Sequence, residues 1–188
     1  MARLKLKYKA ANLLRLERTV DETDNTAIDD AAGGTARVQL FDDRKDAELS
    51  ADEATSQTIL SVNHTRGAGH EFAVDDELHI ELDDGTYDTL AITAIDHAAK
   101  TLTVETGLTS AASSGAALSV LLGSTLTMAE FGTPSIDPVT YNWGYEVTMP
   151  ANHPGVERGQ DVRIQYELLV SGTVQLRERL VATVEGAA

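Results

Sequence analysis

Alternation of apolar and polar residues, broken by turn residues about every eight to twelve positions, limits most strongly how this chain can fold. The alternation is clearest within Phe72–Gly123. Leu78, Ile80 and Leu82 alternate with polar neighbours, and this period of two places them on one face of a strand. An Asp84-Gly85 pair follows, which indicates a hairpin because glycine tolerates positive φ. The segment therefore predicts four short strands in a small, closed β-unit.

The flanking segments predict further strands. The expected strands are Arg37–Phe41, Ile59–Val62, Ser124–Met128, Val162–Val170 and Val174–Val184. We expect Asp42–Arg44 to turn the first of these and Ser171-Gly172 to form a hairpin, with a break at Glu178. Lys45–Gln57 carries little periodicity and predicts a short helix at most. The expected fold class is all-β, with residues 1–58 plus 124–188 forming a discontinuous β-sandwich and residues 59–123 an inserted small β-barrel.

The charge is strongly acidic. Thirty acidic residues oppose fifteen basic ones, and the net charge is −15. The acids are spread through turns, where they form a solvated surface whose self-repulsion destabilises a compact fold unless salt screens it. We interpret the composition as an adaptation to high salt, with an ordinary acidic surface as the alternative.

The first eighteen residues differ in charge from the rest. They hold six basic residues and one acid, for a charge of +5, which leaves −20 on the remainder. The cationic positions that alternate with apolar ones are Arg3, Lys5, Lys7 and Lys9. One hypothesis is a docking arm for an acidic neighbour, such as another copy of this chain. The alternative is an edge strand whose lysines discourage edge-to-edge pairing. Nucleic acid is not an expected partner, because no base-reading motif or aromatic interleaving accompanies the charge.

The large aromatic residues are concentrated in one segment. Tyr141, Trp143 and Tyr145 alternate with Asn142 and Gly144, and Trp143 is the single tryptophan. Such residues anchor a core or centre an interface. A place in the core is favoured for these three aromatics. They are also candidate interface residues, together with Arg3, Lys5, Lys7 and Lys9.

A search for catalytic and metal-binding patterns finds none. There is no cysteine, and the five histidines lack zinc-motif spacing. His64 and His70 beside Glu71 form the best metal candidate, and the acidic Asp21–Gly34 loop does not match a calcium-binding loop. No nucleophile elbow, phosphate-binding loop or dinucleotide fingerprint occurs. We therefore predict no catalytic residues, no metal, no cofactor and no enzymatic activity. We also expect no membrane span or signal peptide, because no apolar run is long enough.

Two segments resemble proteins of virus particles. Phe72–Gly123 contains, in order, FAVDDE, a strand, DDGT, a strand ending in AITAID, a third strand and LTSAASSGA. This order resembles a recurrent pattern in virion proteins of tailed bacteriophages and tailed archaeal viruses. Asn142–Val184 is similar to the closing strands of the immunoglobulin-like domains common in such virions. The two segments cover roughly half of the chain, and Asp75 stands where the usual pattern has glycine.

The resemblance implies a virion structural protein with an immunoglobulin-like sandwich. It implies a place in the head-to-tail joining (neck or connector) region, where copies assemble as a ring. The implied partners are other copies of the chain and portal, connector, capsid or tail proteins, without a membrane. A capsid-surface decoration or turret protein and a tail or host-adhesion module stay as alternatives. The acidic, lysine-poor composition fits a virus of a halophilic archaeon.

Overall fold

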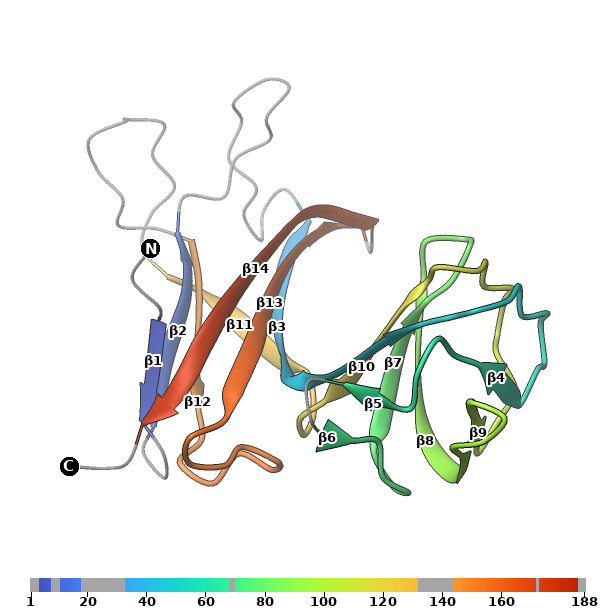
Figure 1. The fold of residues 1–188 in the computed structure, drawn as a ribbon. Coiled ribbons are helices and arrows are strands. Elements are labelled where there is room, and N and C mark those ends of the chain that lie inside the picture. The colour runs from blue at the N-terminus through green and yellow to red at the C-terminus, as the bar shows by residue number, and fades with distance from the viewer. Residues whose placement is uncertain are drawn as a thin grey trace. The chain divides into compact units, whose positions relative to one another are not determined.

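A computed structural model describes residues 4–7, 11–17, 33–67, 70–131, 144–171 and 173–185. These residues form strands, turns and irregular loops and contain no helix, which confirms the all-β prediction. Lys45–Gln57, where a short helix at most was expected, contains the end of β3 followed by turns and isolated bridges. Accordingly, no helix in the described part of the chain could cross a membrane. The chain divides into two compact units (Figure 1): unit 1 comprises Met1–Leu40 and Ser124–Ala188, and unit 2 comprises Phe41–Gly123.

Unit 1 is built on one continuous path of paired strands. Its described strands are β1 (Leu4–Lys7), β2 (Asn12–Glu17), the first part of β3 (Gly34–Glu48), β11 (Leu126–Phe131), β12 (Gly144–Met149), β13 (Asp161–Val170) and β14 (Thr173–Glu185). They follow the order β2-β12-β11-β3-β13-β14-β1. The pairings β2-β12, β12-β11, β11-β3 and β13-β14 are antiparallel, and the pairing of β1 with β14 is parallel.

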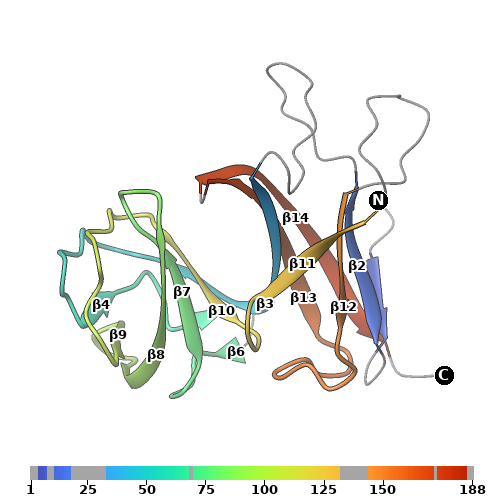
Figure 2. The same cartoon turned by 180° about the vertical axis from the view of Figure 1, so that it is seen from behind.

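Unit 1 must curl, because β1 and β2 lie at opposite ends of this path but are neighbours in sequence. β1 ends at Lys7 and β2 begins at Asn12, and an extended chain covers at most about 18 Å over that separation. Figures 1 and 2 show the two strands side by side. The curled sheet encloses apolar side chains: Leu6, Leu14, Ala36, Val38, Leu40, Met128, Tyr145, Met149, Val162, Ile164, Tyr166, Leu168, Ala182 and Val184 are buried. An immunoglobulin-like strand arrangement stays a prediction.

The hairpin of β13 and β14 is longer and more regular than predicted. It is closed at Ser171, which has a φ of 51°. β14 continues through Glu178, which lies opposite Tyr166, so the break expected there is wrong. The irregularity lies nearer the turn, between Leu168 and Leu169, because a bulge absorbs the register shift and leaves the ladder intact beyond it.

Unit 2 contains a closed circuit of strand pairings. Its strands are the second part of β3, β4 (Ile59–Ser61), β5 (Arg66–Gly67), β6 (His70–Glu71), β7 (Glu77–Glu81), β8 (Tyr87–Asp96), β9 (Thr101–Val104) and β10 (Ala117–Leu121). The path runs β3-β10-β7-β8-β9-β4. A bridge between Leu49 and Val62 then returns the path to the chain that continues β3, with main-chain hydrogen bonds of 2.9 Å on either side of it. The predicted inserted barrel requires such a circuit.

One apolar cluster fills unit 2. The predicted alternation holds on the first hairpin, where Leu78 pairs with Leu90 and both are buried. The cluster comprises Ala47, Leu49, Leu60, Val62, Phe72, Leu78, Ile80, Leu82, Leu90, Ile92, Leu102, Val104, Leu108, Ala112, Leu118 and Val120. All its members lie within Phe41–Gly123, so unit 2 has a hydrophobic core of its own.

β3 passes through the segment predicted to turn it. Val120 lies opposite Asp42 and Ser119 opposite Asp46, so Asp43–Lys45 bulge out of the ladder with β10. The Asp42 carboxylate stabilises this bulge by accepting the Arg44 amide at 3.1 Å and its guanidinium at 2.8 Å. The chain thereby enters unit 2 without leaving the extended conformation.

The boundary between the units therefore differs from the predicted one at its first position. Unit 2 begins at Phe41, whereas the sequence suggested residue 59. The segment between these positions supplies Ala47 and Leu49 to the core of unit 2, and Glu53 pairs with Ala112 through a β-bridge. At Gly123–Ser124 the two divisions coincide.

The loop from Thr106 to Gly115 is held within unit 2. The Asp88 carboxylate accepts the Thr109 amide at 2.8 Å and its hydroxyl at 2.7 Å. Asp83 accepts the Ser113 amide and Asp52 the Ser114 amide, both at 2.8 Å. Hydrogen bonds within the chain therefore hold the loop in place.

The paired aspartates have turn-forming roles. Thr86 donates its hydroxyl and its amide to Asp84, and these bonds hold the pKa of that carboxyl below its ordinary value. Asp76 accepts the Ala73 amide at 2.7 Å. Asp75 has a φ of 71°, a left-handed conformation that glycine adopts without steric cost and aspartate tolerates. Asp75 thus adopts a left-handed backbone conformation that suits glycine, the residue found at this place in the resembled pattern.

Candidate functional site

The predicted interface residues are only partly described by the structure. Arg3, Lys9, Tyr141 and Trp143 lie outside the described residues. Lys5 and Lys7 belong to β1, opposite Thr183 and Glu185 of β14. β1 thus pairs as a strand at one end of the strand order, which is the alternative to a docking arm. A docking role for its lysines stays a prediction.

Tyr145 occupies a core position. It lies in β12, opposite Leu16 of β2 and Glu130 of β11, and its side chain is 1 % exposed. Another chain could contact this side chain only if the sheet opened. The structure therefore places Tyr145 in the core of unit 1, the placement that the sequence favoured over an interface.

The densest polar cluster of unit 1 surrounds the buried carboxylate of Glu167. This residue lies in β13 with its side chain 0 % exposed. Arg37 of β3 donates its Nε to Glu167 Oε2 at 2.7 Å, and its Nη2 lies 2.6 Å from the same oxygen. Arg177 of β14 donates its Nε to Oε1 at 2.9 Å. Two guanidinium groups from neighbouring strands therefore share one carboxylate, which compensates for its removal from water.

The network extends along the same face of the sheet. The amide nitrogen of Gln165 donates to Glu167 Oε1 at 2.9 Å, and its amide oxygen accepts Arg179 Nε at 2.8 Å. Gln39 of β3 lies beside Gln165, with 3.4 Å between Oε1 and Nε2, and donates to Thr125 Oγ1 at 3.2 Å. The polar side chains therefore form a continuous hydrogen-bonded layer across β3, β13 and β14.

Four arginines lie over or beside this layer, and we call them the arginine face: Arg37, Arg163, Arg177 and Arg179. The register places Arg179 opposite Gln165 and Arg177 opposite Glu167, and residues paired in this way share one side of the sheet. Arg37 and Arg177 keep 35 % and 24 % of their side chains exposed, and Arg179 is exposed. Glu167 and Asp161 are the carboxylates of β13 on this side of the sheet, and the four arginines outnumber them, so basic side chains are in excess on the face.

The two units differ sharply in charge. Unit 2 holds sixteen acidic and four basic residues, for a net charge of −12. Unit 1, with fourteen acidic and eleven basic residues, carries only −3. Two cations of unit 2 are engaged locally, since Arg44 bonds Asp42 and Lys45 lies 2.7 Å from Asp76. Most of the chain's excess negative charge therefore belongs to unit 2.

This distribution predicts a salt response confined mainly to unit 2. Raising potassium chloride from dilute buffer to molar concentration should increase the melting temperature of unit 2 more than that of unit 1, because screening relieves its self-repulsion. Far-ultraviolet circular dichroism follows both units together, and pulsed hydrogen–deuterium exchange of peptides from each unit separates them. Equal melting temperatures at low and high salt would contradict the salt-adaptation hypothesis.

The histidines do not form a metal site in the described part of the chain. No group of three or more potential metal ligands occurs there. A shallow hollow of about 350 Å³ on unit 2 is lined by His64, Thr65, His97 and Lys100. His97 bonds Thr65 Oγ1 at 2.8 Å and lies 4.0 Å from Glu71, which is too far for a direct hydrogen bond. The hollow does not gather the oxygen or nitrogen ligands that a metal requires.

His79 is buried, contrary to the outward position that its place in the alternation indicated. Its ring stacks on Tyr87 with 4.7 Å between centroids, and Phe41 lies 5.3 Å away. Its Nδ1 lies 3.0 Å from Thr89 Oγ1. The polar-facing side of β7 thus carries a small aromatic cluster, and His79 packs within it.

Sequence reasoning did not identify the arginine face. The alternation of Asp161, Arg163, Gln165 and Glu167 was visible, but it indicated only a solvent-facing side of a strand. The cluster forms because the hairpin register brings Arg177 and Arg179 opposite that side and β3 adds Arg37. Opposite charges at paired hairpin positions were the available signal.

Comparisons with known proteins identify no family. No family model matches the chain, and no curated protein matches it. Among solved structures, the chain is similar to the VP16-VP17 complex, a complex of the two major capsid proteins of bacteriophage P23-77. That similarity has 12 % sequence identity and a TM-score of 0.23, and it covers 96 % of this chain and 91 % of that chain. A TM-score this low does not establish a shared fold.

Proposed function

We propose that this chain is a non-enzymatic structural protein of a tailed-virus particle. In this proposal it belongs to the head-to-tail joining region and assembles there as a ring of identical copies. Its partners are other copies of itself and the neighbouring portal, connector, capsid or tail proteins. The sequence resemblance to virion proteins is the reason for proposing a virus particle. The distribution of charge in the structure supports assembly between copies.

The observation that carries the proposal is the separation of charge within one chain. Unit 2 has a net charge of −12, whereas the sheet of unit 1 presents four arginines on one face. A ring needs heterologous contacts, in which one surface of a copy meets a different surface of the next. Surfaces of opposite charge suit such contacts and disfavour contacts between like surfaces.

The well-tied loops of unit 2 also favour a structural role. Carboxylates of Asp52, Asp83 and Asp88 accept main-chain amides at 2.8 Å, so these acids hold the loops in place. No group of three or more potential metal ligands occurs among the described residues. A rigid surface with fixed loops is what repeated packing between copies requires.

The test is self-assembly of the purified full-length chain. Sedimentation velocity over a range of protein concentrations should show a discrete oligomer, and negative-stain electron microscopy should show closed rings. In virus particles that carry this chain, labelling should place a small, fixed copy number on the tail axis. A monomer at every concentration and salt would contradict ring assembly. Hundreds of copies over the shell would favour a decoration or turret protein instead.

A further inference from the structure

We infer that the arginine face of unit 1 is the surface that binds the acidic unit 2 of a neighbouring copy. This inference rests on the proposed function and specifies one contact of the assembly. The surface comprises Arg37, Arg163, Arg177 and Arg179 on β3, β13 and β14. The ligand groups are carboxylates on the partner copy.

The arginines are positioned in advance by the layer beneath them. Arg37 binds Glu167 through Nε and Nη2, and Arg177 binds it through Nε. Arg179 is held by one bond from its Nε to Gln165, at 2.8 Å. Because Glu167 and Gln165 are buried and belong to the sheet, these long side chains lose little further conformational freedom on binding.

The geometry leaves donors available for carboxylates. The hydrogen bond of Arg179 to Gln165 uses Nε alone, and its two terminal nitrogens make no hydrogen bond with the described residues. A guanidinium group pairs with a carboxylate in a bidentate manner and does so more strongly than an ammonium group. The face therefore offers arginine forks rather than the diffuse charge of surface lysines.

The partner surface is acidic and belongs to the same kind of chain. Asp75, Glu77 and Glu105 are exposed on unit 2, and Glu77 and Glu105 both flank Ala91 of β8. None of these three carboxylates forms an ion pair with another described residue. A phosphate backbone would also suit arginine forks, but the net charge of −15 opposes the approach of a nucleic acid.

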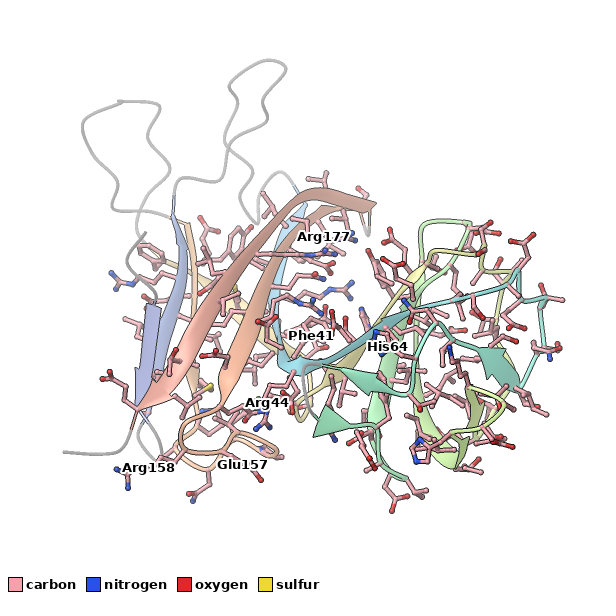
Figure 3. The ribbon with its side chains drawn as sticks, in the orientation of Figure 1. Phe41, Arg44, His64, Glu157, Arg158 and Arg177 are labelled. Atoms are coloured by element: carbon pink, nitrogen blue, oxygen red, sulfur yellow. The ribbon has the colours of Figure 1, made fainter. Side chains whose placement is uncertain are left out.

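The first experiment is charge reversal on the face. Arg179→Glu should raise the protein concentration needed for assembly by at least tenfold, measured by sedimentation velocity at fixed salt. Arg158→Glu is the matched control, because this exposed residue lies in the loop before β13, at the end of unit 1 away from Arg177 (Figure 3). Arg179→Gln removes the charge without reversing it, and should give a smaller effect of the same sign. Circular dichroism and tryptophan fluorescence of each variant should match the unsubstituted chain.

The second experiment is charge exchange. Adding Glu77→Arg or Glu105→Arg to the Arg179→Glu chain should restore part of the lost assembly, because the reversed charge at position 179 then meets a reversed charge on unit 2. Assembly of Arg179→Glu at the unsubstituted concentration would overturn the inference and leave the proposed function standing. A monomeric unsubstituted chain would overturn both. Loss of binding to a duplex DNA probe in Arg179→Glu, with assembly unchanged, would assign the face to nucleic acid and overturn the inference.

Discussion

Replacing Glu167 with alanine is expected to lower the free energy of unfolding of unit 1 by about 3 kcal/mol. The side chain is 0 % exposed and compensates two guanidinium groups, those of Arg37 and Arg177. Its removal leaves two cations facing each other across a site that water reaches poorly. Both arginines are partly exposed and can turn toward solvent. The expected loss of stability is therefore at the lower end of the range of about 3 to 5 kcal/mol that is typical when one partner of a buried ion pair is removed.

Pulsed hydrogen–deuterium exchange during thermal or urea unfolding measures this loss, because peptides from β13 and β14 report on unit 1 alone. A change of this size corresponds to roughly 12 °C in the melting temperature of a unit of this length. Glu157→Ala is the control, since this exposed carboxylate lies in the loop before β13 and should change stability by less than about 0.5 kcal/mol. Equal effects of the two substitutions would show that the Glu167 network does not stabilise unit 1.

The second large effect is expected in unit 2, where Leu60→Ala should cost about 3 kcal/mol. Leu60 is 0 % exposed on β4 and pairs with Leu102, which is also fully buried. Alanine removes three carbon atoms from the core of unit 2, to which Leu60 and its paired residue Leu102 both contribute. The circuit limits how far the strands can close over the cavity, so most of the lost packing is not recovered.

The neighbouring residue provides a matched control. Ile59 has the same number of carbon atoms but is 49 % exposed, and it lies on the opposite side of β4. Ile59→Ala should therefore cost less than about 1 kcal/mol, mainly through reduced β-propensity. Pulsed hydrogen–deuterium exchange should detect the Leu60→Ala transition at a lower temperature in peptides of unit 2, while the transition in peptides of unit 1 stays unchanged. A shift of equal size in the peptides of unit 1 would show that the units unfold together.

The strands were predictable because their chemistry is local. The alternation in Leu78–Leu82 and in Val162–Val170 requires one apolar face. The structure buries the apolar residues of that face except Val170, which is half-buried at the end of β13. The turn at Asp84-Gly85 was also local, and Gly85 has a φ of 80°. The errors arose where two signals competed: Asp42–Arg44 has a turn composition, but pairing with β10 on both sides converts it into a bulge.

The candidate site was predictable only in its composition. The sequence showed that arginine, glutamine and glutamate alternate on one strand, but it did not show that Glu167 is buried. Burial of that carboxylate depends on Arg37, which is 130 positions away in the chain. Tyr145 illustrates the same limit, because an aromatic residue on a strand suits a core and an interface equally well until its neighbours are known.

By itself, the sequence determined that this chain is all-β, strongly acidic and without recognisable catalytic motifs, since periodicity, charge and motif spacing are properties of neighbouring residues. Only the tertiary structure decided which strands share a sheet, and hence that four arginines gather on one face while unit 2 carries −12 of the −15 net charge. The physical reason is register: a strand places alternate side chains on opposite faces, but its partners decide which charges meet there.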